Sequence, residues 1–173
     1  MKIKNLFLLW GGAALAALLL GSCGPLRTPT VIKNAPVENY RYAYVTETQA
    51  LTSSTGYSNG NGGGFMGLFS GGTNITTKTV NPGDVISGEL AKYGFVILSE
   101  LTPEQEAQTV IVNYGESGSR KRGIKEATEV TIQFISADSK QLICSCTAEG
   151  QGQTEADNIR EAIRRALSAL FAQ

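Results

Sequence analysis

The chain has 173 residues, of which 42% are hydrophobic and 17% charged, and its 15 Lys and Arg residues balance 15 Asp and Glu residues. This length suits one ordinary domain, and the hydrophobic content is that of a folded protein rather than a disordered one. A neutral chain lacks the basic excess needed to bind many nucleic-acid phosphates, so no nucleic-acid partner is expected.

The first 23 residues combine a basic start, a short apolar run and a cysteine behind small residues. Lys2 and Lys4 form a basic start, and the apolar run 6–20 that follows has 15 residues, fewer than the roughly 20 that span a bilayer. The run ends in Leu20-Gly21-Ser22-Cys23, which resembles the bacterial lipobox, whose cysteine is lipidated and becomes the first mature residue. We therefore predict a signal peptide at 1–22 and a lipid bilayer as the partner of acylated Cys23. The alternative is a chance Cys after an ordinary signal peptide or a membrane helix.

The residues after Cys23 bear on localisation. Gly24 and Pro25 follow it, and no acidic residue comes before Glu38. In Gram-negative lipoproteins an Asp directly after the Cys often means inner-membrane retention, and acidic clusters just behind the Cys export lipoproteins to the surface in some lineages. Neither is present, so the resemblance implies the periplasmic leaflet of the outer membrane.

The chain behind Cys23 divides into a tether and a folded body. Residues 23–38 contain three prolines and are predicted to be an extended lipidated tether, followed by one domain over 39–173. Within that domain, the alternating tyrosines of 40–45 predict a strand. Residues 48–80 are rich in Gly, Ser, Thr and Asn and are predicted to be a long loop, of the kind that is usually functional or disordered.

Two helices are predicted from their caps and apolar stripes. Asn81 can cap a helix that Pro82 begins and Gly94 ends. Thr154 resembles the start of a capping box, and apolar residues recur at helical spacing from Ile159 to the end of the chain.

Four further strands are predicted between these helices. The runs 95–98 and 109–114 are apolar on both faces, which is typical of interior strands. The run 130–134 alternates as a half-buried strand, and 141–147 returns after a turn. Together the elements predict an α+β fold: a two-layer sandwich of a mixed, mostly antiparallel sheet of about five strands with two helices on one face.

Two segments are candidates for contact with a partner or with lipid headgroups. The first is an apolar island within the Gly-rich loop, formed by Phe65, Met66, Leu68 and Phe69; it either folds back on the body or contacts lipid or another subunit. The second is the only dense basic patch, formed by Arg120, Lys121, Arg122 and Lys125. It is either a solvated hairpin tip or a contact for phosphate headgroups or an acidic partner.

The patterns that suggest catalysis are incomplete. The sequence contains no His, which removes Ser-His-Asp and Cys-His catalysis and the commonest transition-metal ligand, so no metal and no cofactor are expected. The run 150–155 resembles a dinucleotide fingerprint, but Glu155 replaces its third glycine, and the flanking carboxylates would repel a pyrophosphate. We interpret this run as a Gly-rich entry into a capped helix.

Cys144 and Cys146 lie two residues apart on a predicted strand, so both point to one face at a Cα separation of roughly 6.7 Å. This separation and the parallel side-chain directions disfavour a disulfide, and we interpret the pair as small buried hydrophobic residues with free thiols. A redox or intermolecular role is the alternative.

A family resemblance rests on the order of these elements. The lipobox is followed by an early strand, a loop, the helix 83–93, a strand pair, the turn 137–140, a strand, a glycine step and a terminal Ala- and Leu-rich helix. This layout resembles small envelope lipoproteins related to the curli-secretion lipoprotein CsgG and the TolB amino-terminal domain. The resemblance implies a two-layer α+β domain that binds or assembles in the periplasm without catalysis. It provides no catalytic residues, and the segment 48–80 lacks the sustained alternation of the membrane hairpins of CsgG-type channels.

Two functions are therefore weighed. The first is a non-catalytic envelope binding or assembly module that presents the Gly-rich loop and the basic hairpin to an envelope protein or to another copy of itself. The second is a periplasmic hydrolase or transferase that uses carboxylates alone, for example Glu116, Glu149 and Glu155. Converging carboxylates in a pocket would favour the second. A pilus or coat subunit, a third hypothesis, would require an exposed sheet edge.

Overall fold

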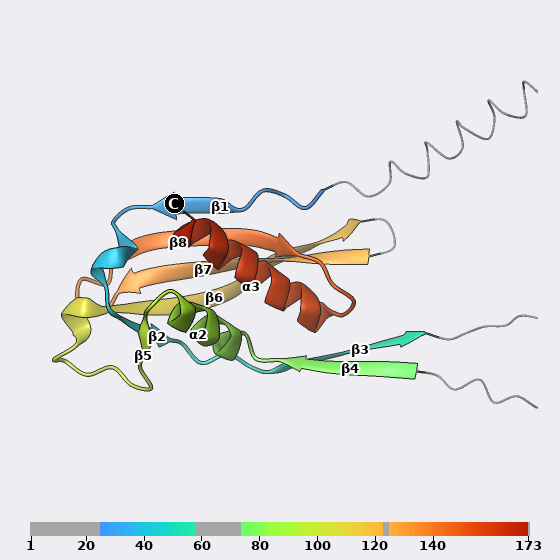
Figure 1. The fold of residues 1–173 in the computed structure, drawn as a ribbon, viewed down its shortest axis with the longest axis horizontal. Helices are drawn as coiled ribbons and strands as arrows, with labels where there is room; N and C mark the ends of the chain where they lie inside the picture. The colour runs from blue at the N-terminus through green and yellow to red at the C-terminus, as the bar shows by residue number, and fades with distance from the viewer. Residues whose placement is uncertain (1–24, 58–73, 123–124, 173) are drawn as a thin grey trace, which may run out of the picture.

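The computed structural model describes residues 25–57, 74–122 and 125–172. The strands are β1 (Thr30–Lys33), β2 (Tyr42–Val45), β3 (Leu51–Tyr57), β4 (Asn74–Val80), β5 (Val96–Ile97), β6 (Thr109–Arg122), β7 (Lys125–Ser136) and β8 (Leu142–Gly150). The helices are α2 (Pro82–Lys92) and α3 (Glu155–Phe171), with single 3-10 turns η1 (Val37–Asn39) and η2 (Glu106–Gln108). The predicted α+β fold is confirmed: α2 and α3 lie on the same side of the large sheet (Figure 1).

The large sheet is mixed and mostly antiparallel, as predicted. It has six strands in the order β1-β8-β7-β6-β2-β5. The pairs β1–β8, β8–β7 and β7–β6 are antiparallel, whereas β2 is parallel to both β6 and β5. The predicted count of about five strands omits β1, and β3 and β4 form a separate two-stranded sheet.

One core lies between the helices and the sheet. Alternate residues of the central strands, including Val112, Ile132, Phe134 and Cys146, are fully buried against α2 and α3. The helices contribute the apolar stripes that the sequence predicts, with Ile86 and Leu90 from α2 and the following residues from α3: Ile159, Ala162, Ile163, Ala166, Leu167 and Leu170. The sheet alternation and the helical period therefore produce one shared interior.

Both helices begin and end as their local sequence predicts. The side chain of Asn81 accepts a hydrogen bond from the Gly83 amide at 3.0 Å, and Gly94, just past α2, has a positive φ of 91°. At α3 the Thr154 hydroxyl accepts from the Asp157 amide at 3.2 Å, and the Asp157 carboxylate accepts from the Thr154 amide at 3.3 Å. This reciprocal pair confirms the capping box.

The segment predicted as a tether is part of the folded domain from residue 25 onwards. Its residues Thr30–Lys33 form edge strand β1, which pairs with β8 from Thr147 to Cys144. Arg27 is also held, because its amide donates to the Glu149 carboxylate at 3.0 Å. A four-residue strand next to prolines has too weak an alternation to stand out, and it becomes a strand because β8 offers an unpaired edge.

Much of the predicted Gly-rich loop is a β-hairpin. β3 and β4 pair in continuous register from Leu51 opposite Val80 to Tyr57 opposite Asn74. The hairpin extends along the long axis beyond the base of α2 (Figure 1). Its Ser- and Thr-rich strands show no apolar alternation, so sequence periodicity missed them. Residues 58–73, with the island Phe65, Met66, Leu68 and Phe69, lie outside the described residues.

Two other strand predictions need correction. The run 95–98 was expected inside the sheet, but β5 is a two-residue edge strand whose Val96 is 44% exposed. β6 and β7 extend well past the predicted 109–114 and 130–134, forming a long polar hairpin that is held by cross-strand pairing. Over the described ranges, no helix is long and apolar enough to cross a membrane.

Candidate functional site

The candidate site lies where the far part of the β6–β7 hairpin passes the start of α3. Two features meet there, a polar cleft and a cluster of ion pairs around Glu149. The cleft has a volume of about 780 Å³, within the range of roughly 300–1,000 Å³ that is usual for ligand sites. Its lining is mostly polar: Glu116, Gly118, Ser119, Lys125, Glu126, Thr128, Gly152, Gln153, Thr154, Glu155 and Asn158.

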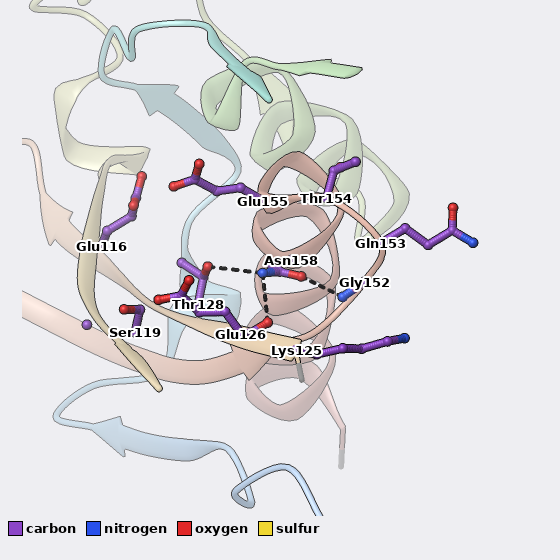
Figure 2. A pocket seen from close by; sticks show the side chains of 11 residues that line it. Glu116, Ser119, Lys125, Glu126, Thr128, Gly152, Gln153, Thr154, Glu155 and Asn158 are labelled. Atoms are coloured by element: carbon purple, nitrogen blue, oxygen red, sulfur yellow. Dashed lines mark hydrogen bonds between the residues drawn. The ribbon is translucent and has the colours of Figure 1, made fainter. Parts of the chain in front are cut away.

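Asn158 holds the helix start against the hairpin at the base of this cleft. Its side-chain amide donates to the Glu126 carbonyl at 3.0 Å and to the Thr128 hydroxyl at 3.4 Å, and its Oδ1 accepts from the Gly152 amide (Figure 2). Asn158 is only 6% exposed. A buried amide with both ends satisfied fixes the distance between α3 and β7 and so shapes the cleft.

Two of the predicted carboxylates, Glu116 and Glu155, line the cleft together. Figure 2 shows Glu155 extending from the first turn of α3 towards Glu116 on β6. The hydroxyl of Tyr114 donates to Glu116 Oε1 at 3.0 Å. Burial of Tyr114, reinforced by the charges of Glu116 and Glu155, raises the pKa of its phenol, so this hydroxyl stays a donor. The glutamates of the lining would repel a pyrophosphate, which agrees with the interpretation that the run 150–155 is not a dinucleotide-binding motif.

The third predicted carboxylate, Glu149, is not in this cleft. It is 2% exposed and accepts two hydrogen bonds from Arg120, Nε to Oε1 at 2.9 Å and Nη2 to Oε2 at 2.7 Å. Arg27 adds its backbone amide at 3.0 Å and its side-chain Nε at 3.5 Å. The Arg120 hydrogen bonds lower the pKa of Glu149 against the opposing effect of its burial. Glu149 is therefore an ionised structural anchor.

The basic patch divides into a paired part and an exposed part. Arg120 is ion-paired with Glu149, and its side chain remains 38% exposed. Lys121 at the end of β6 and Lys125 at the start of β7 are exposed. The side chain of Arg122 lies outside the described part of the chain, as do residues 123–124 and Cys23.

The cysteine interpretation is confirmed. Cys144 and Cys146 are free, fully buried and on the helix-covered face of β8. Burial raises the pKa of each thiol to about 12. Among the described residues there is no group of three or more Cys, Asp or Glu side chains placed to hold a metal ion.

Sequence reasoning missed the residues that assemble this site. Arg27 was assigned to the tether, and nothing near it in sequence indicates its contact with Glu149, which is 122 residues away. Asn158 looked like an ordinary polar residue of the last helix. An unusual polar residue on the apolar stripe of α3, next to Ile159, is the only local signal that could have found it.

The fold and site define a single α+β domain with a polar cleft at one end, and comparison with known proteins assigns no family to it. No family model and no curated protein matches the chain. Similar solved structures include a PelC dodecamer from Paraburkholderia phytofirmans, with a TM-score of 0.48 and 16% identity over 85% of this chain and 98% of that chain. A variant PelC dodecamer gives 0.42 and 13% over 81% and 95%. These values are too low to transfer a function.

Proposed function

We propose that the chain is a bacterial cell-envelope lipoprotein, a non-catalytic binding or assembly module that acyl chains on Cys23 hold at the periplasmic face of the outer membrane. The observation that carries this proposal is the lipobox 20–23 behind a basic start and a short apolar run. Several acyl chains, at about 0.8 kcal/mol per buried CH₂, give firm membrane attachment.

The start of the domain is compatible with such an anchor. Arg27, only four residues after Cys23, is tied to Glu149 through its amide, and Arg165 of α3 donates to the Arg27 carbonyl at 2.9 Å. An anchor this close to a fixed point would hold the domain beside the bilayer, without a long flexible linker.

A binding or assembly role is supported by the two edges of the large sheet. Edge strand β1 exposes 55% of Ile32, and edge strand β5 exposes 44% of Val96. Edge strands with exposed apolar side chains offer unpaired backbone N–H and C=O groups and an apolar contact surface to a partner strand. Self-association or pairing with another envelope protein therefore has a physical basis in this chain.

The test of the anchor compares wild-type protein with a Cys23→Ser variant. We expect mass spectrometry of the wild type to show an acylated Cys23 as the first residue, and the wild type to float with membranes. The Cys23→Ser protein should be soluble or keep its leader. Native protein that retains residues 1–22, or a variant that is processed and still firmly bound, would refute the proposal.

Assembly is tested by crosslinking in intact envelopes. We expect Ile32→Lys, which places a charge on the β1 edge, to lose a crosslinked species that the wild type forms. Thr30→Lys on the same strand is the matched control for added charge. Only monomeric protein in every preparation would contradict an assembly role.

The alternative of a carboxylate-only hydrolase or transferase rests on Glu116 and Glu155, which line one cleft. Its test is the release of soluble fragments from isolated envelope polysaccharide. Under this alternative, Glu116→Gln and Glu155→Gln would each abolish an activity that the wild type shows, whereas absence of wild-type activity would count against it.

A further inference from the structure

We propose that the end of the β6–β7 hairpin faces the bilayer, where Lys121 and Lys125 contact the headgroups of anionic phospholipids. This orientation rests on the proposed acylation of Cys23. It goes beyond anchoring because it states which surface meets the membrane and which surface is left for partners.

The first step is the fixed position of the chain near its anchor. Arg27 is held at the hairpin through Glu149, which also binds Arg120 of β6, and its guanidinium lies 3.6 Å from Glu129 of β7. The segment 25–29 runs from β1 towards the same end of the molecule as the end of β6 and the start of β7 (Figure 1). The point where the described chain begins is therefore attached to the hairpin.

The second step is the short reach of the anchor. Arg27 is four positions after Cys23, and a fully extended chain over that distance in sequence spans at most about 14 Å. β6 continues only two residues beyond Arg120, about 7 Å of strand. An acylated Cys23 therefore keeps the end of the hairpin close to the membrane surface.

The third step is the charge at that end. Lys121 and Lys125 are exposed, and over the described residues 120–127 they outnumber the one carboxylate, Glu126, which lies opposite Lys121. The exposed Glu116 and Glu155 lie further from the end of the hairpin, in the cleft. Each basic residue near an anionic surface contributes about 1 kcal/mol. The hairpin strands here are polar, which favours contact with headgroups over insertion.

The opposite end of the long axis carries the opposite charge. The loop before β6 exposes Glu100 and Glu104, and the β7–β8 turn exposes Asp138 together with one basic residue, Lys140. The exposed charges of these two segments are therefore negative on balance. Figure 1 shows these two segments at the end away from the end of β6 and the start of β7. An anionic surface would repel this acidic end and attract the basic one, so charge and anchor favour the same orientation.

The experiment uses a single tryptophan as a reporter of depth. The only Trp, Trp10, lies in the predicted signal peptide, so the mature protein offers no background. Glu126→Trp marks the hairpin end and Asp138→Trp the opposite end, and each replaces one exposed carboxylate. Acylated protein is reconstituted into anionic vesicles containing a phospholipid with a headgroup nitroxide, which quenches nearby tryptophan.

We expect at least threefold stronger quenching of the Glu126→Trp protein than of the Asp138→Trp protein. Equal quenching, or stronger quenching at residue 138, in protein that is acylated and floats with vesicles would overturn the orientation and leave the proposed lipoprotein function standing. Absence of acylation by mass would overturn both.

The role of the lysines is tested in the Glu126→Trp background. Lys121→Glu is expected to reduce quenching by about half in anionic vesicles and to have no effect in zwitterionic ones. Lys33→Glu, which reverses an exposed lysine on β1, is the matched control and should change neither. The same loss with Lys33→Glu, or no loss with Lys121→Glu, would overturn the headgroup contact.

Discussion

Gly150 lies where β8 passes directly under α3, and there is no room for a side chain at this position. A Cβ built there would lie 1.9 Å from the Asn158 carbonyl oxygen and 2.3 Å from the Ala162 amide nitrogen. Both atoms are helix backbone and cannot rotate away. The glycine that resembles part of a nucleotide-binding motif therefore serves close packing between helix and strand.

Gly150→Ala is expected to lower the free energy of unfolding by about 3 kcal/mol, because α3 must move away from the sheet. Gly115→Ala, in the same sheet with no atom within 4 Å of the added Cβ, is the control and should change stability little. Denaturant unfolding monitored by circular dichroism measures both. Equal stability of the two variants would show that α3 does not approach β8 this closely.

The thiols of Cys144 and Cys146 are expected to resist alkylation in the native protein. Burial keeps them protonated up to a pKa of about 12, and the thiolate is the reactive form. Mass spectrometry after treatment with iodoacetamide at pH 8 should show neither thiol modified until denaturant is added, and both modified afterwards. Rapid native labelling, or a bridge between the two residues, would contradict their buried placement.

At the scale of elements, the β3–β4 hairpin depends on contacts with the first turn of α3. Lys78 Nζ donates to the Asp157 carboxylate at 2.9 and 2.8 Å, and the Ser53 hydroxyl accepts from the Ala156 amide at 3.0 Å. Asp157 thus serves the helix cap and the hairpin together. The hydrogen bonds from Lys78 are the main reason that the pKa of Asp157 is lowered.

Lys78→Met is expected to loosen the hairpin without unfolding the domain. Loss of a partly exposed ion pair is worth about 1 kcal/mol at most, which corresponds to about fivefold faster amide exchange. Hydrogen exchange should show this acceleration in β3 and β4 and not in β7 or β8. Lys125→Met on the other hairpin is the control; a uniform change over all strands would instead indicate a global loss of stability.

The elements predicted well are those whose cause is local. α2 and α3 are indicated in the sequence by Asn81, Gly94 and Thr154 at their ends and by apolar residues that recur every three or four positions. The hairpins and β1 have no such local cause. Their Ser, Thr, Lys and Arg residues become strands only because a partner strand is present to pair with them.

For the whole molecule, stability is expected to fall in acid. Glu149, Asp157 and Glu89 have folded-state pKa values below their ordinary values of 4.5, 3.8 and 4.5. The unfolded chain therefore binds protons first as pH falls, and the stabilisation present at neutral pH is lost progressively below about pH 5.

Denaturant unfolding at a series of pH values measures this loss. Glu149→Gln should be about 2 kcal/mol less stable than wild type at pH 7, since it loses charge-assisted hydrogen bonds. It should also show a shallower decline in acid. Asp138→Asn, which removes one exposed carboxylate, is the matched control. An unchanged slope in Glu149→Gln would mean that the ion pairs around Glu149 contribute nothing to the pH dependence.

For the candidate site, the sequence predicted some of the residues but not their arrangement. Glu116, Glu149 and Glu155 stood out as carboxylates, but only the folded chain brings Glu116 and Glu155 to one cleft and places Glu149 with Arg27 and Arg120. The basic patch likewise looked uniform. Its division into a paired Arg120 and exposed lysines depends on the sheet order β8-β7-β6, in which Arg120 of β6 reaches across β7 to Glu149 of β8.

The amino-acid order alone determined the fold class, both helix caps, the buried cysteines and the lipobox pattern, because each depends on neighbouring residues or on a short period. Tertiary structure decided the edge strand β1, the two polar hairpins and the fate of each charge. These depend on contacts between different segments of the chain, from the strand pairs of the hairpins to the contact of Arg27 with Glu149, 122 residues apart. Pairing of this kind leaves no periodic pattern in the sequence, because the stabilising contacts form only once the partner segment is in place.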